Sequence, residues 1–213
     1  MNYNEFKNSV QSWPLIFSRD LLSRQKNKQI IRNQLGRWQN RKLLVKLRRG
    51  VFLLNANDRK INPSKIYLAN QLYSPSYVSL EYALYYYGLI PERVTVLSSI
   101  TTKKTLRFTN KIAAFIYQHI KPEAFRGFKA VKDEAGLVCF IAEPEKAIVD
   151  FFYLNLNKFY GQDESIFEES YRLQNLESLK AKKVMKFAEI FGNGKLMRVS
   201  QSFCAIIKKE SGK

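Results

Sequence analysis

The chain has 213 residues, 46% hydrophobic and 14% aromatic, which is enough to bury a core and excludes the composition of a disordered protein. Its formal net charge of +18, from 36 Lys and Arg against 18 Asp and Glu, favours a polyanionic partner: DNA, RNA or an anionic membrane surface. No run of about 18 uncharged apolar residues is present, and the first residues lack the order of a signal peptide. We therefore expect a cytoplasmic protein that is not inserted in a membrane.

The positive charge is concentrated near the N-terminus. Residues 1–60 contain 14 Lys and Arg against 3 Asp and Glu, and the stretch from Arg24 to Arg49 has 10 cations and no carboxylate. A charged run is often no more than a solvated face. Its meaning therefore depends on the elements that carry the cations.

Three helices are predicted in the first forty residues, and the third is the best defined. Its apolar residues Ile31, Leu35 and Trp38 recur at i, i+4 and i+7, which predicts one buried stripe on a helix over Lys28–Asn40. The first helix is expected over Asn4–Trp13, and the second from the N-cap Ser18 to about Gln25. A polar break at Gln25–Asn27 separates the second helix from the third.

Two strands follow, at Leu43–Leu47 and Val51–Leu54, joined by a basic turn in which Gly50 can take a positive φ. Three helices and a basic hairpin are the layout of a winged helix-turn-helix, whose third helix enters the major groove of DNA. The alternative is a small domain that only packs on the rest of the protein.

Residues for DNA contact are predicted on the third helix, opposite its apolar stripe, and on the hairpin. Gln and Asn can form two hydrogen bonds with adenine and Arg with guanine, while the hairpin cations suit phosphates or the minor groove. The predicted DNA-binding residues are Lys28, Gln29, Arg32, Asn33, Arg37, Lys46, Arg48 and Arg49.

The polar stretch Asn55–Asn62 predicts a boundary between a DNA-binding domain, residues 1–60, and a second domain, residues 61–213. Helices are expected from Pro63 to Leu72 and from Ser79 to about Tyr87, closed by Gly88. Seven of the twelve tyrosines lie in this region. We favour helix packing with hydroxyls at the surface over an aromatic platform for single-stranded nucleic acid.

The fold class expected is α+β: the winged helix-turn-helix, then a mixed domain with an antiparallel meander and flanking helices. Short apolar runs separated by turn residues predict the meander strands Val94–Ser98, Thr105–Thr109, Ala114–Ile120, Phe125–Val131 and Leu137–Ile141. Helices are expected from Pro144 to about Leu154, over Gln174–Phe191 and over Lys195–Lys208.

Residues suited to catalysis or metal binding are sparse. Two cysteines, Cys139 and Cys204, make neither a disulfide framework nor a zinc set and are expected to be small buried hydrophobes. His119 is expected to be a hydrogen-bonded residue at the end of a strand, and Lys146 with Asp150 an ordinary i, i+4 surface pair. We predict no enzyme, no metal and no cofactor. The alternative is a nucleic-acid-processing enzyme or RNA-binding protein that uses the tyrosine-rich helices and the meander.

Two segments resemble a known family. Residues 79–84, SLEYAL, with residues 88–91, GLIP, resemble one family motif, and residues 141–150, IAEPEKAIVD, resemble a second. Together with the wing LRRGVF at residues 47–52, they resemble the AbiEi antitoxins, transcriptional repressors of bacterial abortive-infection toxin–antitoxin loci.

The resemblance covers roughly Phe17 to Leu154, and the role of the segment after Asn157, which resembles no known sequence, stays open. It implies an N-terminal winged helix that binds inverted repeats in its own promoter. It also implies a C-terminal domain that counters a nucleotidyltransferase-type toxin encoded beside it. Arg32, Arg37, Arg48 and Arg49 correspond to the family's DNA-contacting positions, and the family offers no catalytic residue to carry over.

Overall fold

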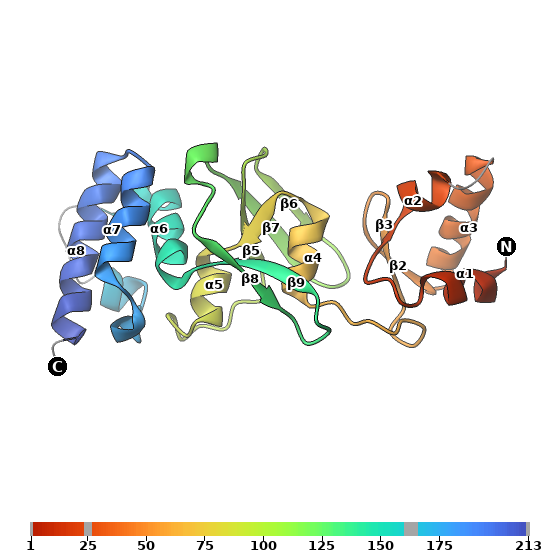
Figure 1. The fold of residues 1–213 in the computed structure, drawn as a ribbon, viewed down its shortest axis with the longest axis horizontal. Coiled ribbons are helices and arrows are strands. Elements are labelled where there is room, and N and C mark those ends of the chain that lie inside the picture. Colours follow the sequence, from red (N-terminus) through yellow and green to blue (C-terminus); the bar gives the residue numbers. More distant parts are fainter. Residues whose placement is uncertain (1, 24–26, 160–165, 212–213) are drawn as a thin grey trace.

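The computed structural model describes residues 2–23, 27–159 and 166–211. The fold is α+β, as predicted. The described residues up to Leu54 form a first lobe and those after 64 a second lobe, joined by a loop over residues 55–64 (Figure 1). The predicted end of the second helix and most of the polar break after it lie outside the described residues.

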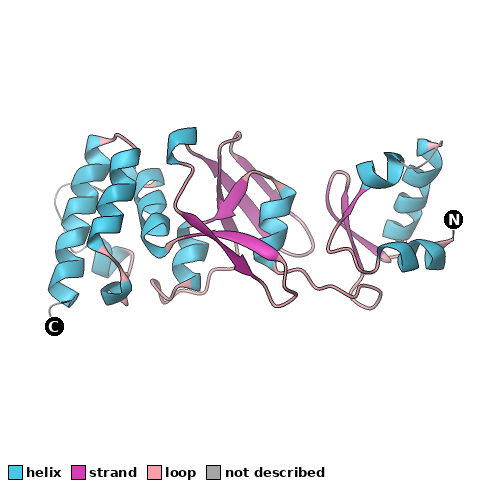
Figure 2. Cartoon of the chain, in the orientation of Figure 1, coloured by secondary structure: helices cyan, strands magenta, loops and turns pink. Residues whose placement is uncertain are grey.

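The first lobe consists of three helices and a small sheet (Figure 2). Its sheet has the order β1-β3-β2 and is antiparallel throughout. The third helix has the predicted bounds, whereas the two-residue strand β1 was not predicted because it is too short to show alternation. The elements are α1 (Tyr3–Val10), β1 (Ile16–Phe17), α2 (Ser18–Ser23), α3 (Lys28–Asn40), β2 (Leu44–Arg48) and β3 (Val51–Leu54).

The apolar stripe of α3 faces the core of the first lobe, as predicted. Ile31, Leu35 and Trp38 are buried there. The ring of Phe6, on α1, stacks on that of Trp38 with 4.4 Å between centroids. This packing leaves the opposite side of α3 on the outside of the lobe.

Strand β3 is buried on both faces, because it lies between two hydrophobic clusters. Phe52 and Leu54 belong to the core of the first lobe, while Val51 and Leu53 belong to the larger cluster that continues through the second lobe. Alternate residues of a strand point to opposite faces. The two lobes are therefore in apolar contact across the small sheet.

The second lobe is built on a six-stranded sheet of order β6-β7-β5-β4-β9-β8. Its helices α4 (Lys65–Leu72) and α5 (Leu80–Tyr86) are close to the predicted ones, and Gly88 closes α5 with a φ of +68°. The strands are β4 (Ser76–Val78), β5 (Leu97–Thr101), β6 (Leu106–Thr109), β7 (Ala114–His119), β8 (Phe128–Lys132) and β9 (Val138–Ala142).

The predicted antiparallel meander is wrong, since this sheet is mixed. Strand β5 pairs parallel with β7, and β4 pairs parallel with β9. There are two physical reasons. Strand β7, and not β6, lies next to β5, and β4, a three-residue strand absent from the prediction, lies between β5 and β9.

Helices α6 (Pro144–Leu154), α7 (Ala181–Ile190) and α8 (Gly194–Ser211) lie at the end of the molecule away from the first lobe (Figure 1). Pro144 stands in the first turn of α6, as predicted. The helix expected over Gln174–Phe191 is interrupted, because Lys180 is extended and α7 begins after it. None of the described helices combines the length and the apolar character needed to cross a membrane.

Candidate nucleic-acid interface

The outward side of α3 carries the predicted base-contacting residues. Lys28, Gln29, Arg32, Asn33 and Arg37 are all exposed. The Gln29 Nε2 donates a hydrogen bond of 3.0 Å to the Asn33 Oδ1 one turn away, which holds the two amides side by side. The remaining Gln29 Oε1 and Asn33 Nδ2 can serve as an acceptor and a donor, the two groups needed to pair with the major-groove edge of adenine.

The start of α3 is fixed and presents an apolar side chain. Asn27 caps the helix, since its side chain accepts hydrogen bonds from the backbone N–H groups of Gln29 and Ile30. Ile30 is 54% exposed beside Gln29. Ile30 is not among the predicted DNA-binding residues, because those are all polar. Its position off the apolar stripe was the available signal.

The positive charge on this surface is not neutralised by its surroundings. No carboxylate of the described residues lies within ion-pair distance of Lys28, Arg32 or Arg37. Among its described residues, the first lobe makes the ion pairs Lys7–Asp58 and Arg19–Asp20. An uncompensated cationic face attracts polyanions through the field that it creates.

The hairpin adds two further exposed cations, Lys46 on β2 and Arg49 in the turn. Gly50 has a φ of +77°, which confirms its predicted place in the turn. Its carbonyl oxygen accepts a hydrogen bond of 2.8 Å from the N–H of Ser18, at the start of α2. The turn is therefore braced against the helical part of its own lobe.

Arg48, the third predicted cation of the hairpin, contacts the second lobe. Its Nη1 donates a hydrogen bond of 2.7 Å to the carbonyl oxygen of Leu72, and its guanidinium lies 5.0 Å from the ring centroid of Tyr73 and 5.7 Å from that of Phe108. Contacts to the second lobe therefore hold the guanidinium of Arg48, and its predicted contact with DNA stays a prediction.

A second polar contact joins the lobes close to Arg48. The Asn110 Nδ2, from the turn between β6 and β7, donates a hydrogen bond of 3.0 Å to the carbonyl oxygen of Leu47. We call these contacts of Leu47, Arg48 and Asn110 the lobe junction. They hold the hairpin against the second lobe in addition to the apolar contact through β3.

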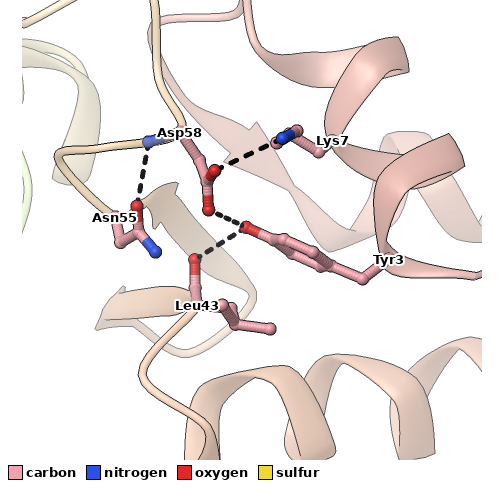
Figure 3. A network of polar contacts seen from close by, with 5 residues as sticks. All are labelled: Tyr3, Lys7, Leu43, Asn55 and Asp58. Atoms are coloured by element: carbon pink, nitrogen blue, oxygen red, sulfur yellow. Dashed lines mark hydrogen bonds and ion pairs between the residues drawn. The ribbon is translucent and has the colours of Figure 1, made fainter.

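A polar network fixes α1 to the segments that flank the hairpin (Figure 3). The hydroxyl of Tyr3 donates a hydrogen bond of 2.6 Å to Asp58 Oδ2 and lies 3.5 Å from the carbonyl oxygen of Leu43. Lys7 Nζ lies 3.5 Å from Asp58 Oδ1, and the N–H of Asp58 donates to the side chain of Asn55. The hydrogen bond from Tyr3 holds the pKa of Asp58 below its usual value. Burial, followed by the contact with Asp58, raises the pKa of Tyr3.

Lys146 and Asp150 form a buried pair, so the prediction of a surface pair is wrong. Their side chains are 1% and 0% exposed and hydrogen-bonded to each other. Asp150 Oδ2 also accepts hydrogen bonds of 3.0 Å from Tyr77 and 2.9 Å from Ser79. Burial raises the pKa of Asp150 against the opposing effect of Lys146. This cluster ties α6 to the segment that precedes α5.

Most of the tyrosines in the second lobe pack, as favoured, although several hydroxyls are used inside the protein and not at the surface. Tyr117 donates to the carbonyl oxygen of Ala69 and Tyr87 to that of Ala142, in addition to the bond from Tyr77, whereas the bond from Tyr73 to the carbonyl oxygen of Lys104 is exposed. The prediction for His119 is confirmed: it is exposed at the end of β7, with its Nδ1 3.1 Å from the carbonyl oxygen of Lys103. The predicted burial of the cysteines, Cys139 and Cys204, is also confirmed.

In the described part of the chain, no group of three or more His, Cys, Asp or Glu is placed to hold a metal ion. No protein-family model matches the sequence, and no curated protein matches it either. The interface on α3 and the hairpin is therefore interpreted from its own geometry.

Proposed function

We propose that the protein is a DNA-binding transcriptional repressor whose first lobe is a winged helix-turn-helix. The observation that carries the proposal is the outward side of α3, where amides and guanidinium groups are exposed without a neighbouring carboxylate among the described residues. Such side chains suit the major groove. The succession of three helices and a hairpin supports α3 as the helix that enters the groove.

The proposed DNA contacts are of two kinds, contacts to base edges and contacts to phosphates. Gln29, Asn33 and Arg37 would meet base edges, while Lys28, Arg32, Lys46 and Arg49 would neutralise phosphates. Inverted repeats in the protein's own promoter, which the resemblance implies, would require two copies of the chain. Their two α3 helices would enter half-sites about 34 Å apart, or a multiple of that distance.

The decisive experiment is a salt titration of binding to double-stranded DNA, followed by fluorescence anisotropy. A surface that neutralises about 6–10 phosphates loses roughly a thousandfold or more in affinity between about 50 and 200 mM salt. A flat salt response, or preference for single-stranded RNA of the same length, would overturn the proposal.

We propose further that the second lobe counters a neighbouring nucleotidyltransferase-type toxin, as the resemblance implies. In support, the two segments that carry the resemblance meet in the fold, where Ser79 of the first donates a hydrogen bond to Asp150 of the second. The test is co-expression with the adjacent reading frame from an unrelated inducible promoter. The protein and its Arg37→Ala variant should both rescue growth. A toxic neighbour that the full chain does not counter would exclude the antitoxin role.

A further inference from the structure

A cleft of about 520 Å³ opens where the first lobe meets the second. The end of α3, the hairpin and the turn between β6 and β7 each contribute to its walls. The lining residues include Asn40, Lys42, Lys46, Arg48, Arg49 and Lys111.

The cleft is basic. Five of its lining residues are cationic, and none of the described residues that line it is acidic. Arg48 is held in the lobe junction, but Lys42, Lys46, Arg49 and Lys111 are exposed. Like charges gathered in a concave surface repel each other and concentrate the positive potential there. An anionic ligand relieves that repulsion.

The second lobe supplies one of these cations at a fixed position. The Oδ1 of Asn110 accepts hydrogen bonds of 2.8 Å from the N–H of Ile112 and 3.2 Å from that of Ala113, which closes the turn around Lys111. The Nδ2 of the same Asn110 donates to the carbonyl oxygen of Leu47. Lys111 is therefore held beside the hairpin by a residue of its own turn.

The cleft is continuous with the reading side of α3. Asn33, Arg37 and Asn40 are exposed at i, i+4 and i+7, so they follow one another along one side of the helix. Asn40, the last of them, also lines the cleft. A duplex whose major groove receives α3 would thus carry its sugar–phosphate backbone towards the cleft.

We propose that this cleft holds the DNA phosphates next to the base-reading site, with Lys111 of the second lobe gripping the backbone alongside Lys42 and Lys46. The inference rests on the proposed DNA binding and extends it: the second lobe takes part in DNA contact. Residues 1–60 are then not the whole DNA-binding unit.

The test measures salt dependence with the full-length protein and a duplex of about 21 base pairs, two helical turns, selected by the wild type from a random pool. Each phosphate contact contributes about 0.9 to the slope of log affinity against log salt. Lys111→Ala and Lys42→Ala should each reduce the slope by about one and weaken the selected and scrambled duplexes by the same factor. Lys186→Ala, an exposed lysine on α7 at the other end of the molecule, is the matched control and should change neither.

Lys111→Gln, with melting followed in parallel, separates loss of charge from loss of fold. An unchanged slope in both Lys111→Ala and Lys111→Glu, with steep salt dependence in the wild type, would overturn the inference but leave the proposed function intact. A second result would also overturn the inference: pyrophosphate raises the melting temperature of the wild type but not that of Lys111→Glu, while the two proteins bind DNA equally. The cleft would then be a site for small anions. A wild type that binds no duplex would overturn both.

Discussion

The Arg48 guanidinium donates a hydrogen bond of 2.7 Å to the carbonyl oxygen of Leu72, so a residue of the hairpin is bound to the last residue of α4. The same group packs on the rings of Tyr73 and Phe108. A partly buried hydrogen bond from a charged donor is stronger than one from a neutral donor. This contact therefore fixes the orientation of the hairpin relative to the large sheet.

We expect Arg48→Ala to lower the free energy of unfolding by about 1–3 kcal/mol, because it removes a charge-assisted hydrogen bond and two cation–π contacts. The adjacent Arg49→Ala is the matched control. Arg49 is exposed, so its loss should leave stability unchanged and reduce the salt slope of DNA binding by about one. Chemical denaturation and anisotropy check the two effects. The reverse pattern would place Arg48, and not Arg49, on the DNA.

Arg37→Ala should affect sequence preference rather than overall grip. Arg37 lies one turn from Asn33 on the exposed side of α3, so its loss should cost about 1–3 kcal/mol on the selected duplex and relax the preference at one base pair. Competition between selected and scrambled duplexes measures the difference. If Arg37→Ala and Arg49→Ala each weaken both duplexes by one common factor, α3 does not read bases.

Part of the fold could be predicted from local sequence and part could not. The bounds of α3 follow from the spacing of Ile31, Leu35 and Trp38, because a helix with one buried side imposes that period. The order of strands in the large sheet depends on long-range pairing. Strand β4 pairs with both β5 and β9, but its three residues are too few to show the alternation that predicts a strand.

The candidate site, too, could be predicted in part from local sequence and in part could not. Exposure of Gln29, Asn33 and Arg37 follows from helical geometry once the buried stripe is known. The role of Arg48 does not, since a hairpin cation that faces solvent and one that faces another lobe have the same local sequence. Nor does the burial of Lys146 with Asp150, because the i, i+4 spacing suits surface and interior alike.

Ile30 should contribute to base preference through the 5-methyl group of thymine. It is exposed at the start of α3, next to Gln29, and an apolar side chain in the major groove favours that methyl group. Ile30→Ala should weaken binding to the selected duplex several-fold. Replacing thymine by uracil should produce the same loss in the wild type and no additional loss in the variant. Additive losses would exclude direct contact between the two groups.

The pair Lys146–Asp150 should be essential as a pair. Lys146→Met leaves the Asp150 carboxyl buried without its cation, and we expect a loss of about 3–5 kcal/mol in the free energy of unfolding. The double variant Lys146→Met with Asp150→Leu removes both charges, but it also leaves the buried hydroxyls of Tyr77 and Ser79 without their acceptor, so it should recover only part of that loss. Denaturant unfolding measures the cycle. A single variant as stable as the wild type would show that Asp150 does not need Lys146.

The contact between Tyr3 and Asp58 should make the first lobe sensitive to acid. Because the hydrogen bond from Tyr3 lowers the pKa of Asp58, the carboxylate stabilises the fold fully above its unfolded pKa of about 3.9, and this stabilisation is lost as the pH falls through the lower folded value. Asp58→Asn should therefore be less stable than the wild type at pH 7, and the difference should shrink in acid.

Tyr3→Phe is the matched variant, since it keeps the ring that packs 5.7 Å from that of Trp38 and removes the hydroxyl. Both variants should flatten the acid side of the stability curve, measured as melting temperature against pH. A difference between wild type and Tyr3→Phe that stays constant from pH 7 down to about pH 2 would mean that the hydroxyl stabilises the fold without acting on the Asp58 carboxylate.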